Sequence, residues 1–275
     1  MSVPDEILIV LVIHEMNLAE SPAFHSLSKG LSHIQKNGIL FVYNNSKVSQ
    51  AIPDNDQWTI YYQHDPTNPG VSQAYNTAFI KAKQLQLKGM LFVDQDTSFP
   101  ETIFQQYHQS VKEYPECNVF APLLVDKRGI ISPFQVGLTS GKRLKEYTPG
   151  EKNLNETHAI NSGLLVTLNI FDKCGGYDER LRLDFSDFNF FKRLQHYTTS
   201  IVLVDAECQH EHSSTEKTSI AKAISRFEIY LQGVRIMGNE SSGFLFQSRA
   251  LLRALKLSVQ YRSFRFIGSF LFRGS

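Results

Sequence analysis

Cysteine is scarce in this 275-residue chain, and its spacing excludes the common cysteine-based sites. The three cysteines, Cys117, Cys174 and Cys208, lie far apart in the sequence and form no Cys-x-x-Cys pair. A zinc knuckle or a disulfide framework therefore does not fit the sequence. Free thiols of this kind are typical of a reducing compartment.

Long apolar runs are also missing. No segment approaches the ~18–20 apolar residues that a helix needs to cross a bilayer. The run Ile7–Ile13 is only seven residues long, and Asp5 and Glu6 precede it where a signal peptide would carry cations. We therefore interpret this run as a buried strand, and we expect a cytoplasmic protein.

Acidic residues are absent after Glu240, although the whole chain is balanced, with 28 Lys and Arg against 27 Asp and Glu. A net charge of +1 does not suggest a nucleic-acid binder. Residues 241–275 carry six cations among leucines and phenylalanines. Such a segment can lie on the inner face of the cell membrane as a peripheral contact. A helix packed on the body, or an oligomer contact, is the alternative.

The glycine-rich loops that cradle phosphates in dinucleotide-binding and P-loop proteins are absent as well. The segment Gly137–Arg143 is the nearest approach. It is one residue too short, and it lacks the Ser or Thr that follows the lysine in a P-loop. A strand followed by a glycine turn is the better interpretation.

The first half of the chain alternates strands with helices. This rhythm predicts an α/β fold, with a mostly parallel sheet and helices on both faces. The expected strands are Ile7–Ile13, Ile39–Tyr43, Trp58–Gln63, Gly89–Val93, Val119–Val125, Ile130–Val136 and Ile201–Val204. The expected helices are Pro22–Lys36, Val71–Gln86 and Pro100–Tyr114.

The second half is less regular and ends in helices. The polar stretch Lys142–Thr157 is predicted as a surface loop. From about Glu216 onward, apolar residues recur at helical spacing. We expect one domain over 1–215 and a helical, basic and aromatic extension over 216–275.

Two carboxylates follow the predicted strand Gly89–Val93. Asp94 and Asp96 lie just past its carboxyl end, where open α/β sheets bind their ligands. Two oxygen donors at this spacing suit Mg²⁺ or Mn²⁺ carrying a diphosphate. A polar turn before a helix is the alternative.

Three more segments carry polar side chains that could serve a site. A turn with Gly70 leads into a helix bearing Asn76, whose first amides could face an anion. Asp187 precedes an aromatic run, where a carboxylate can act as a general base or simply cap a helix. His210 and His212 follow the last strand, and one of them could be a metal ligand.

Taken in order over roughly residues 5–235, these pieces resemble the inverting glycosyltransferases of family two. Their order and spacing together are specific. The tetrapeptide Asp-Gln-Asp-Thr at residues 94–97 resembles the form of this motif in the bacterial rhamnosyltransferase-like branch of the family. The matching pieces are Asn68-x-Gly70, Ala74-x-Asn76, Phe92–Thr97, Asn161–Gly163, Gly175–Glu179, Asp184–Asp187 and His210 with Ser213.

The resemblance implies a GT-A fold, a nucleoside diphosphate sugar donor, and Mn²⁺ or Mg²⁺ as cofactor. It implies that Asp96 and His210 hold the metal and that Asp187 is the catalytic base. The residues implied at the nucleotide-sugar site are His14, Asn44, Asn68, Gly70, Asn76, Asp94 and Gln95. Those implied near the acceptor are Asn161, Ser162, Gly163 and Asp184.

The sequence departs from the family pattern at two places. Tyr43 stands where the family has an Asp after the second strand, so base recognition passes to Asn44 or Ser46. Ser186 stands where many members have Glu before the catalytic Asp.

The expected function is transfer of a hexose or deoxyhexose, with rhamnose as one candidate, to a cell-surface glycan or its lipid-linked precursor. A UDP-glucose or UDP-galactose transferase of the same fold is the nearest alternative. A catalytically dead sugar-nucleotide or polysaccharide-binding protein is the other. A sugar-nucleotide pyrophosphorylase would need a basic, glycine-rich loop after the first strand, and His14–Asn17 offers none.

Overall fold

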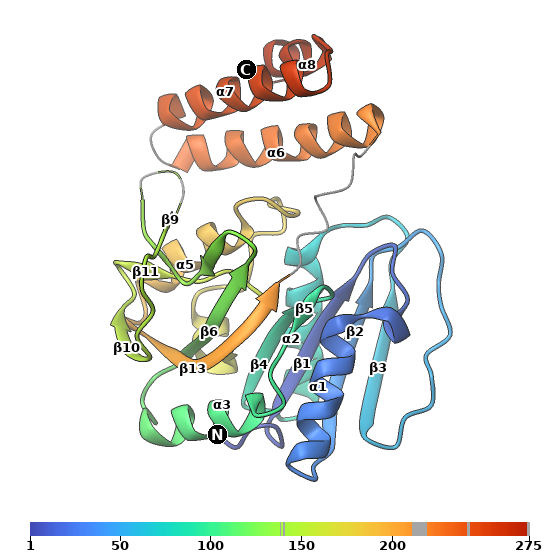
Figure 1. The fold of residues 1–275 in the computed structure, drawn as a ribbon, viewed down its shortest axis with the longest axis vertical. Helices are drawn as coiled ribbons and strands as arrows, with labels where there is room; N and C mark the ends of the chain where they lie inside the picture. Colours follow the sequence, from blue (N-terminus) through green and yellow to red (C-terminus); the bar gives the residue numbers. More distant parts are fainter. Residues whose placement is uncertain (138, 140, 211–218, 241–242, 274–275) are drawn as a thin grey trace.

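The computed structural model describes residues 1–137, 139, 141–210, 219–240 and 243–273. A ten-stranded sheet forms the centre of the molecule, and a three-helix unit lies beyond one of its ends (Figure 1). The strands of the sheet follow one another in the order β10-β13-β6-β12-β4-β1-β2-β3, with β5 on β13 and β7 on β6. A small sheet adds the order β11-β8-β9.

The elements follow the predicted alternation. The strands of the main sheet are β1 Ile7–Ile13, β2 Gly38–Asn44, β3 Trp58–His64, β4 Gly89–Asp94, β5 Thr97–Ser98, β6 Val119–Asp126, β7 Gly129–Ser132, β10 Gly150–Asn153, β12 Leu164–Thr167 and β13 Ser200–His210. The small sheet holds β8 Phe134–Gln135, β9 Lys142–Arg143 and β11 Thr157–His158. The helices are α1 Pro22–His33, α2 Val71–Gln84, α3 Ile103–Glu113, α4 Leu168–Lys173, α5 Ser186–Leu194, α6 Ile220–Glu240, α7 Gly243–Gln260 and α8 Arg265–Arg273, with a short 3₁₀ turn at Leu18–Glu20.

Strand β1 lies at the centre of the parallel part of the sheet and is buried on both faces. It pairs in parallel with β2 and β4, and β2 pairs in parallel with β3. Its odd-numbered residues pack with α1 and α3, while its even-numbered residues pack with α2, α4 and α5. This two-sided burial explains the uninterrupted apolar run in the sequence.

The predicted surface loop Lys142–Thr157 is wrong in part. It contains strands β9 and β10, and the first residue of β11 ends it. β10 pairs antiparallel with β13 at the edge of the sheet. Its side chains alternate between exposed and half-buried without an apolar face, so its polar sequence did not predict a strand.

The last strand is longer than the apolar run that predicted it. β13 continues from Ile201–Val204 to His210, because Ala206 and Cys208 turn inward while Asp205, Glu207 and Gln209 face solvent. The strand predicted over Ile130–Val136 is divided into β7 and β8 around Pro133. Proline cannot donate to a strand ladder, which accounts for the break.

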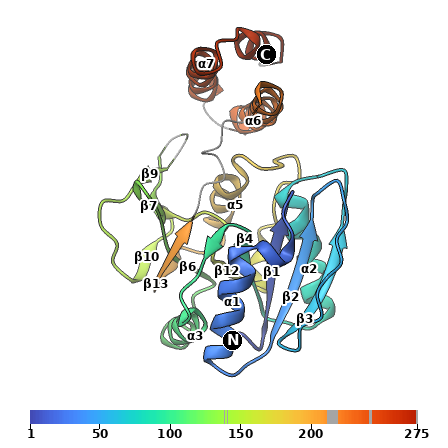
Figure 2. The ribbon, with the colours of Figure 1, turned by 45° about the vertical axis from the view of Figure 1, so that its right-hand side comes forward.

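The three C-terminal helices form a layer of their own. Both views place α6 nearer to the body of the molecule, with α7 and α8 farther out (Figures 1 and 2). They share an apolar cluster with Leu181 and with the half-buried Phe185 and Phe188 of the body. The expected boundary between 215 and 216 falls in 211–218, which is outside the described residues.

Candidate active site

The carboxyl ends of β1, β2 and β4 meet at the edge of the sheet that faces the C-terminal helices (Figure 1). Asp94 is the last residue of β4 and lies opposite Val12 of β1. The residues that follow each of these strands are therefore neighbours in space. This is the position at which α/β sheets of this kind bind ligands.

Hydrogen bonds hold the Asp94–Asp96 turn in place. The Asp94 amide donates to the hydroxyl of Ser162 at 3.0 Å. Gln95 clamps the turn to the end of β1: its Oε1 accepts the His14 amide at 2.8 Å, and its Nε2 donates to the His14 carbonyl at 3.3 Å. The Gln95 side chain and the His14 backbone thus bind each other, and both residues support the turn.

Asp96 and His210 lie side by side although 114 positions separate them. Thr97 of β5 pairs with His210 of β13, which brings the His210 Nδ1 within 3.7 Å of the Asp96 Oδ1. The buried Thr97 hydroxyl is 2.8 Å from the same Nδ1 and 2.8 Å from the Ser162 hydroxyl. Thr97 therefore contacts the same ring nitrogen of His210 that lies beside Asp96.

The donors at this position fit a divalent cation in part. One carboxylate and one imidazole are adjacent, and diphosphate oxygens would complete the shell around a hard cation. Within the described parts of the chain, no cluster of three His, Cys, Asp or Glu side chains forms a metal site on its own. His212 and Ser213 are outside the described residues, so His210 is the histidine placed beside Asp96.

Asp187 lies in the first turn of α5 and is electrostatically coupled to the Asp94–Asp96 turn. Its Oδ1 accepts the Phe188 amide at 2.7 Å. Burial raises the pKa of Asp187 to about 6. Burial, followed by the charges of Asp96 and Asp187, raises the pKa of Asp94 to about 7. The three carboxylates expected to form the site therefore do gather in one place.

A tyrosine that the sequence analysis missed lies among these carboxylates. Tyr75 of α2 is fully buried, and its hydroxyl has no hydrogen-bond partner among the described residues. Burial raises its pKa well above the usual value, and the charges of Asp94 and Asp187 add to this effect. Its ring lies 5.0 Å from that of Tyr177, whose hydroxyl donates to the Asn161 Oδ1 at 2.6 Å.

We expect Tyr75→Phe to leave the melting temperature of the free protein unchanged or higher, because an unpaired buried hydroxyl costs about 1–3 kcal/mol. Tyr177→Phe is the matched control: it removes a buried hydroxyl that is hydrogen-bonded, so it should lower the melting temperature. Thermal unfolding of the three proteins without ligand measures both effects. Equal destabilisation by the two substitutions would contradict the assignment of Tyr75 as an unpaired group facing the site.

The turn before α2 is shaped by a close backbone contact. Gly70 has φ 102°, and a Cβ at this position would collide with the Arg182 carbonyl. The same carbonyl accepts the Val71 amide at 2.9 Å, and the Arg182 guanidinium donates to the Asn68 carbonyl. The Val71 amide, the first of the α2 amides expected to face an anion, is therefore occupied by protein.

Asn76 and the Asn161–Gly163 segment hold neighbouring loops. Asn76 accepts the Tyr177 amide at 2.8 Å and donates to the Tyr177 carbonyl at 2.9 Å, which fastens α2 to the loop after α4. Gly163 has φ 78°, and a Cβ there would lie 2.5 Å from Pro122. These contacts are between protein groups, and the expected roles of Asn76 toward the donor and Asn161 toward the acceptor stay predictions.

At the end of β2, the side chain that lines a cavity is that of Asn45 and not that of Asn44. The Asn44 side chain is fully buried; it accepts the Ser46 amide and donates to the Tyr62 hydroxyl. Asn45 is also buried, but its Oδ1 has no partner among the described residues, and it lines a cavity. Tyr43 donates to the Asp65 carboxylate at 3.2 Å. Burial and that carboxylate raise the pKa of Tyr43 to about 12.

The cavity that Asn45 lines has a volume of about 360 Å³ and lies between the body and α6. Four loops of the body line it, together with side chains of α6. Its residues are His14, Glu15, Asn45, Lys47, Pro66, Thr67, Asn68, Arg182, Ser225, Glu228, Ile229 and Gln232. Two residues expected at the nucleotide-sugar site, His14 and Asn68, are therefore on its wall.

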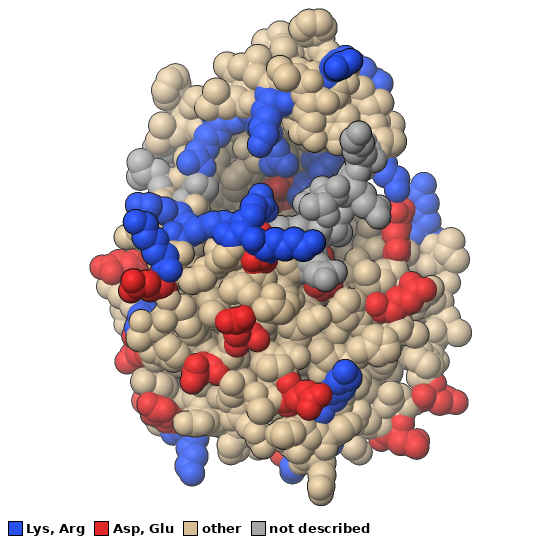
Figure 3. Space-filling view, in the orientation of Figure 1, with Lys and Arg blue, Asp and Glu red and all other residues tan. Residues whose placement is uncertain are grey.

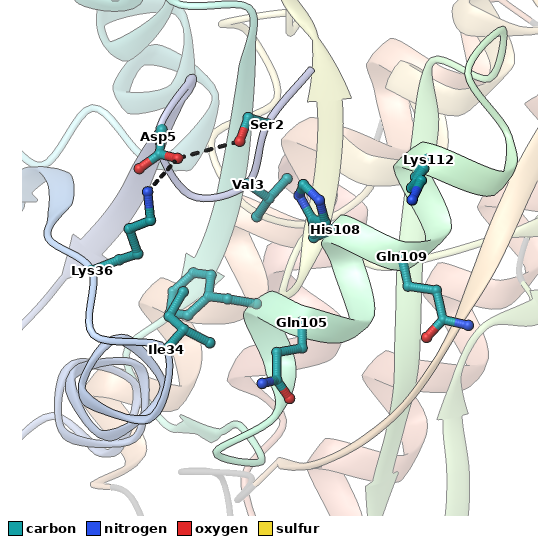
Figure 4. A pocket seen from close by; sticks show the side chains of 10 residues that line it. Ser2, Val3, Asp5, Ile34, Lys36, Gln105, His108, Gln109 and Lys112 are labelled. Atoms are coloured by element: carbon teal, nitrogen blue, oxygen red, sulfur yellow. Dashed lines mark hydrogen bonds and ion pairs between the residues drawn. The ribbon is translucent and has the colours of Figure 1, made fainter.

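A larger hollow of about 490 Å³ lies far from this site. It is formed by the N-terminal segment, the residues after α1 and one face of α3, close to the amino ends of the parallel strands (Figure 4). Its charged groups include Asp5 and Lys36, which form an ion pair at 3.2 Å. Nothing in it joins the carboxylates of the candidate site.

Asp184, expected near the acceptor, is bound by arginines of the C-terminal helices. Arg226 of α6 pairs with both of its oxygens, and the Arg253 guanidinium of α7 is 3.8 Å from Oδ1. Arg253 also lies 4.0 Å over the ring of Tyr230. Lys and Arg side chains surround the hollow between the helices and the body (Figure 3).

Comparison with solved structures identifies the fold. A structure of S. aureus TarS 1–349 in complex with UDP-GlcNAc matches with a TM-score of 0.51 at 14% identity, over 82% of this chain and 66% of that one. The fold is that of TarS. A second structure of TarS 1–349 matches with a TM-score of 0.50 at 14% identity, over 82% of this chain. The mostly parallel α/β sheet of GT-A type expected from the sequence is thereby confirmed.

This chain spans 65% of the length of that second TarS 1–349 chain, so the likeness to TarS concerns part of the larger protein. No protein-family model matches the sequence, and no curated protein matches it. At 14% identity the likeness to TarS establishes the fold and leaves the chemistry to be argued from the site.

Proposed function

We propose that this chain is an inverting glycosyltransferase. In the proposed reaction, a hexose or deoxyhexose passes from a nucleoside diphosphate sugar to a hydroxyl of a cell-surface glycan or its lipid-linked precursor. The observation that carries the proposal is the meeting of Asp94, the Asp96–His210 pair and Asp187 in the fold of TarS. A cavity is linked to this meeting point through His14, which lines the cavity and is hydrogen-bonded to Gln95. The TarS complex with UDP-GlcNAc favours a UDP-sugar as the donor.

In the proposed site, the cavity beside α6 receives the nucleoside. Its volume of about 360 Å³ is within the range of small-molecule sites. The unpaired Asn45 Oδ1 is an acceptor suited to an N–H of a nucleobase. Asn45 thus takes the part that the sequence assigned to Asn44 or Ser46.

Asp187 is the proposed base. It would accept the proton of the acceptor hydroxyl as the oxygen attacks the sugar carbon from the side opposite the diphosphate. Because attack and departure occur in one step, no covalent enzyme intermediate forms and the configuration at the carbon inverts. A pKa of about 6 leaves Asp187 mostly ionised at neutral pH and still able to hold the proton as it moves.

Asp96 and His210 would hold a Mn²⁺ or Mg²⁺ ion, whose contribution is to neutralise the charge on the departing diphosphate. Thr97 would orient the His210 ring, and Ser162 would hold the backbone that carries Asp94. The transferase is thus proposed to be metal-dependent. The proposed metal ligands are different residues from the proposed base, so metal binding and proton transfer can be tested by separate mutations.

A panel of UDP-, dTDP- and GDP-sugars, with and without Mn²⁺, tests the proposal by thermal shift. We expect the melting temperature to rise with one nucleotide class, UDP in the first place, and to rise further when Mn²⁺ is present. Stabilisation by dTDP-rhamnose instead would name the rhamnose donor. If no nucleotide stabilises the protein in either condition, the glycosyltransferase proposal is wrong. Binding without turnover on any glycan would indicate a sugar-nucleotide-binding protein.

A further inference from the structure

Helix α7 is apolar on two sides. One side carries Phe246, Ala250 and Ala254, which are buried in the cluster shared with α6 and α8. This buried face already accounts for the packing of α7 against both neighbouring helices. The second apolar side therefore requires a separate explanation.

That second side is a stripe of large apolar side chains facing solvent. At 100° per residue the stripe covers an arc of about 100° and runs the whole length of the helix. Val259 is 80% exposed and Phe244 is 83% exposed. The members of the stripe are Phe244, Leu251, Leu252, Leu255 and Val259.

Helix α8 and the residue before it extend the same kind of surface. Phe264, Leu271 and Phe272 are all exposed, Phe272 to 87%. Eight of the twelve large apolar side chains that the described structure exposes therefore lie within residues 243–273. Contiguous exposure of this kind marks a surface that binds a partner.

The charge around the stripe indicates what kind of partner binds there. Arg249 and Lys256 are exposed along one edge of it, and Arg262 and Arg265 are exposed near its end. No acidic residue follows Glu240 in the sequence. Above the hollow, the visible surface of the helical unit carries no acidic side chain (Figure 3).

An anionic lipid surface satisfies both properties of this face, since it accepts apolar side chains and attracts cations. A second copy of the chain would cover the apolar stripe but would not pair with the cations. In a symmetric dimer formed through this face, the cations of one copy would lie opposite the cations of the other, with no carboxylate to compensate them.

We propose that the exposed faces of α7 and α8 dock on a bilayer that contains anionic phospholipid. The structure has no helix, among its described residues, with the length and hydropathy of a membrane span. The helices lie in the plane of the interface, with the stripe among the acyl chains and the cations at the headgroups. This surface does not depend on the proposed donor chemistry.

The docking orients the candidate site toward the lipid. The α7 and α8 layer lies at the end of the molecule that the carboxyl edge of the sheet faces (Figures 1 and 2). Asp184, three residues before Asp187, is bound by Arg226 and Arg253 of the same helical unit. A bilayer under the stripe therefore lies on the same side of the sheet as the three carboxylates.

Co-sedimentation of the full chain with vesicles tests the proposal. We expect binding to phosphatidylcholine vesicles that contain about 30% phosphatidylglycerol, weaker binding to pure phosphatidylcholine, and weakening of the former in about 0.5 M NaCl. The double variant Leu252→Glu, Val259→Glu should lose binding to the anionic vesicles by about tenfold or more.

The matched control is Ile80→Glu, Tyr197→Glu, which adds the same two charges at exposed apolar positions outside the helical unit. It should bind vesicles nearly as the wild type does. Circular dichroism and thermal melting check that both double variants fold. Wild-type protein that ignores anionic vesicles, or a stripe variant that binds them unchanged, would overturn the proposal. So would a wild-type dimer that the stripe variant makes monomeric without any vesicle binding.

Discussion

The variant Asp187→Asn is expected to lose turnover by about 10²–10⁴-fold while it still binds the nucleotide sugar. An amide has no basic oxygen to accept the proton of the acceptor hydroxyl, and the donor cavity is lined by other residues. In the wild type, kcat/KM should rise with pH through about 6, where Asp187 ionises, and should then level off. Initial rates and nucleotide binding, measured across pH for both proteins, check this.

The same substitution should stabilise the protein. Burial raises the pKa of Asp187 from 3.8 to about 6, so the folded state holds this proton more tightly than the unfolded chain does. The free energy of unfolding of the wild type therefore falls as the pH rises from 3.8 toward 6. Asp187→Asn avoids this penalty, which is about 1–3 kcal/mol at pH ~7 and vanishes in acid.

Asp172→Asn is the control for both effects, because Asp172 is an exposed carboxylate in an ion pair with Lys83. It should change neither turnover nor the pH dependence of stability. Urea unfolding at two pH values measures the stabilities. An Asp187→Asn enzyme that retains full activity would remove Asp187 from the role of base.

Asp96→Ala is expected to abolish the extra stabilisation that Mn²⁺ gives to nucleotide-sugar binding. The carboxylate supplies one of the two protein donors in the proposed metal site, so its loss should cost at least the ~10–100-fold in metal affinity that follows the loss of an outer-shell partner. His210→Ala should have the same effect, because the Asp96 Oδ1 and the His210 Nδ1 are only 3.7 Å apart. The double variant should be little worse than either single variant.

Thermal shifts with nucleotide and increasing Mn²⁺ measure this directly, and Asp54→Ala serves as the control. Asp54 is exposed on the segment between β2 and β3, so its removal changes the net charge equally without touching the site. If Asp96→Ala responds to Mn²⁺ as the wild type does, no metal is held between Asp96 and His210. The nucleotide could still bind in that case, which separates this outcome from failure of the donor site.

The part of the site that could be predicted from the sequence is the part set by strand ends. The apolar runs of β1 and β4 are buried on both faces, so their pattern is unambiguous, and Asp94 and Asp96 follow where the strands end. Tyr75 lies one position before Asn76, which was singled out. An aromatic residue at helical spacing is usually a core residue, so its unpaired hydroxyl gave no signal.

The parts that could not be predicted depend on contacts between distant segments. The acceptor role of Asp184 is implied by the resemblance and stays a prediction, but nothing in its own stretch of sequence shows that Arg226 and Arg253 fold back over it. Asn44 and Asn45 differ only in which side of the chain they face after β2. β10 has no apolar pattern, so its sequence does not show that it pairs with β13.

The contact between α6 and Phe185, the residue before α5, also determines how this protein can be shortened. Gly233 of α6 has no side chain, so Phe185 packs against the helix backbone, and its ring lies 5.4 Å from that of Tyr230. A chain cut before Ile220 would leave Phe185 and Leu181 uncovered and Asp184 without its arginines. The sheet without these helices is therefore not expected to be a stable unit, and a shortened chain for expression or crystallisation should keep them.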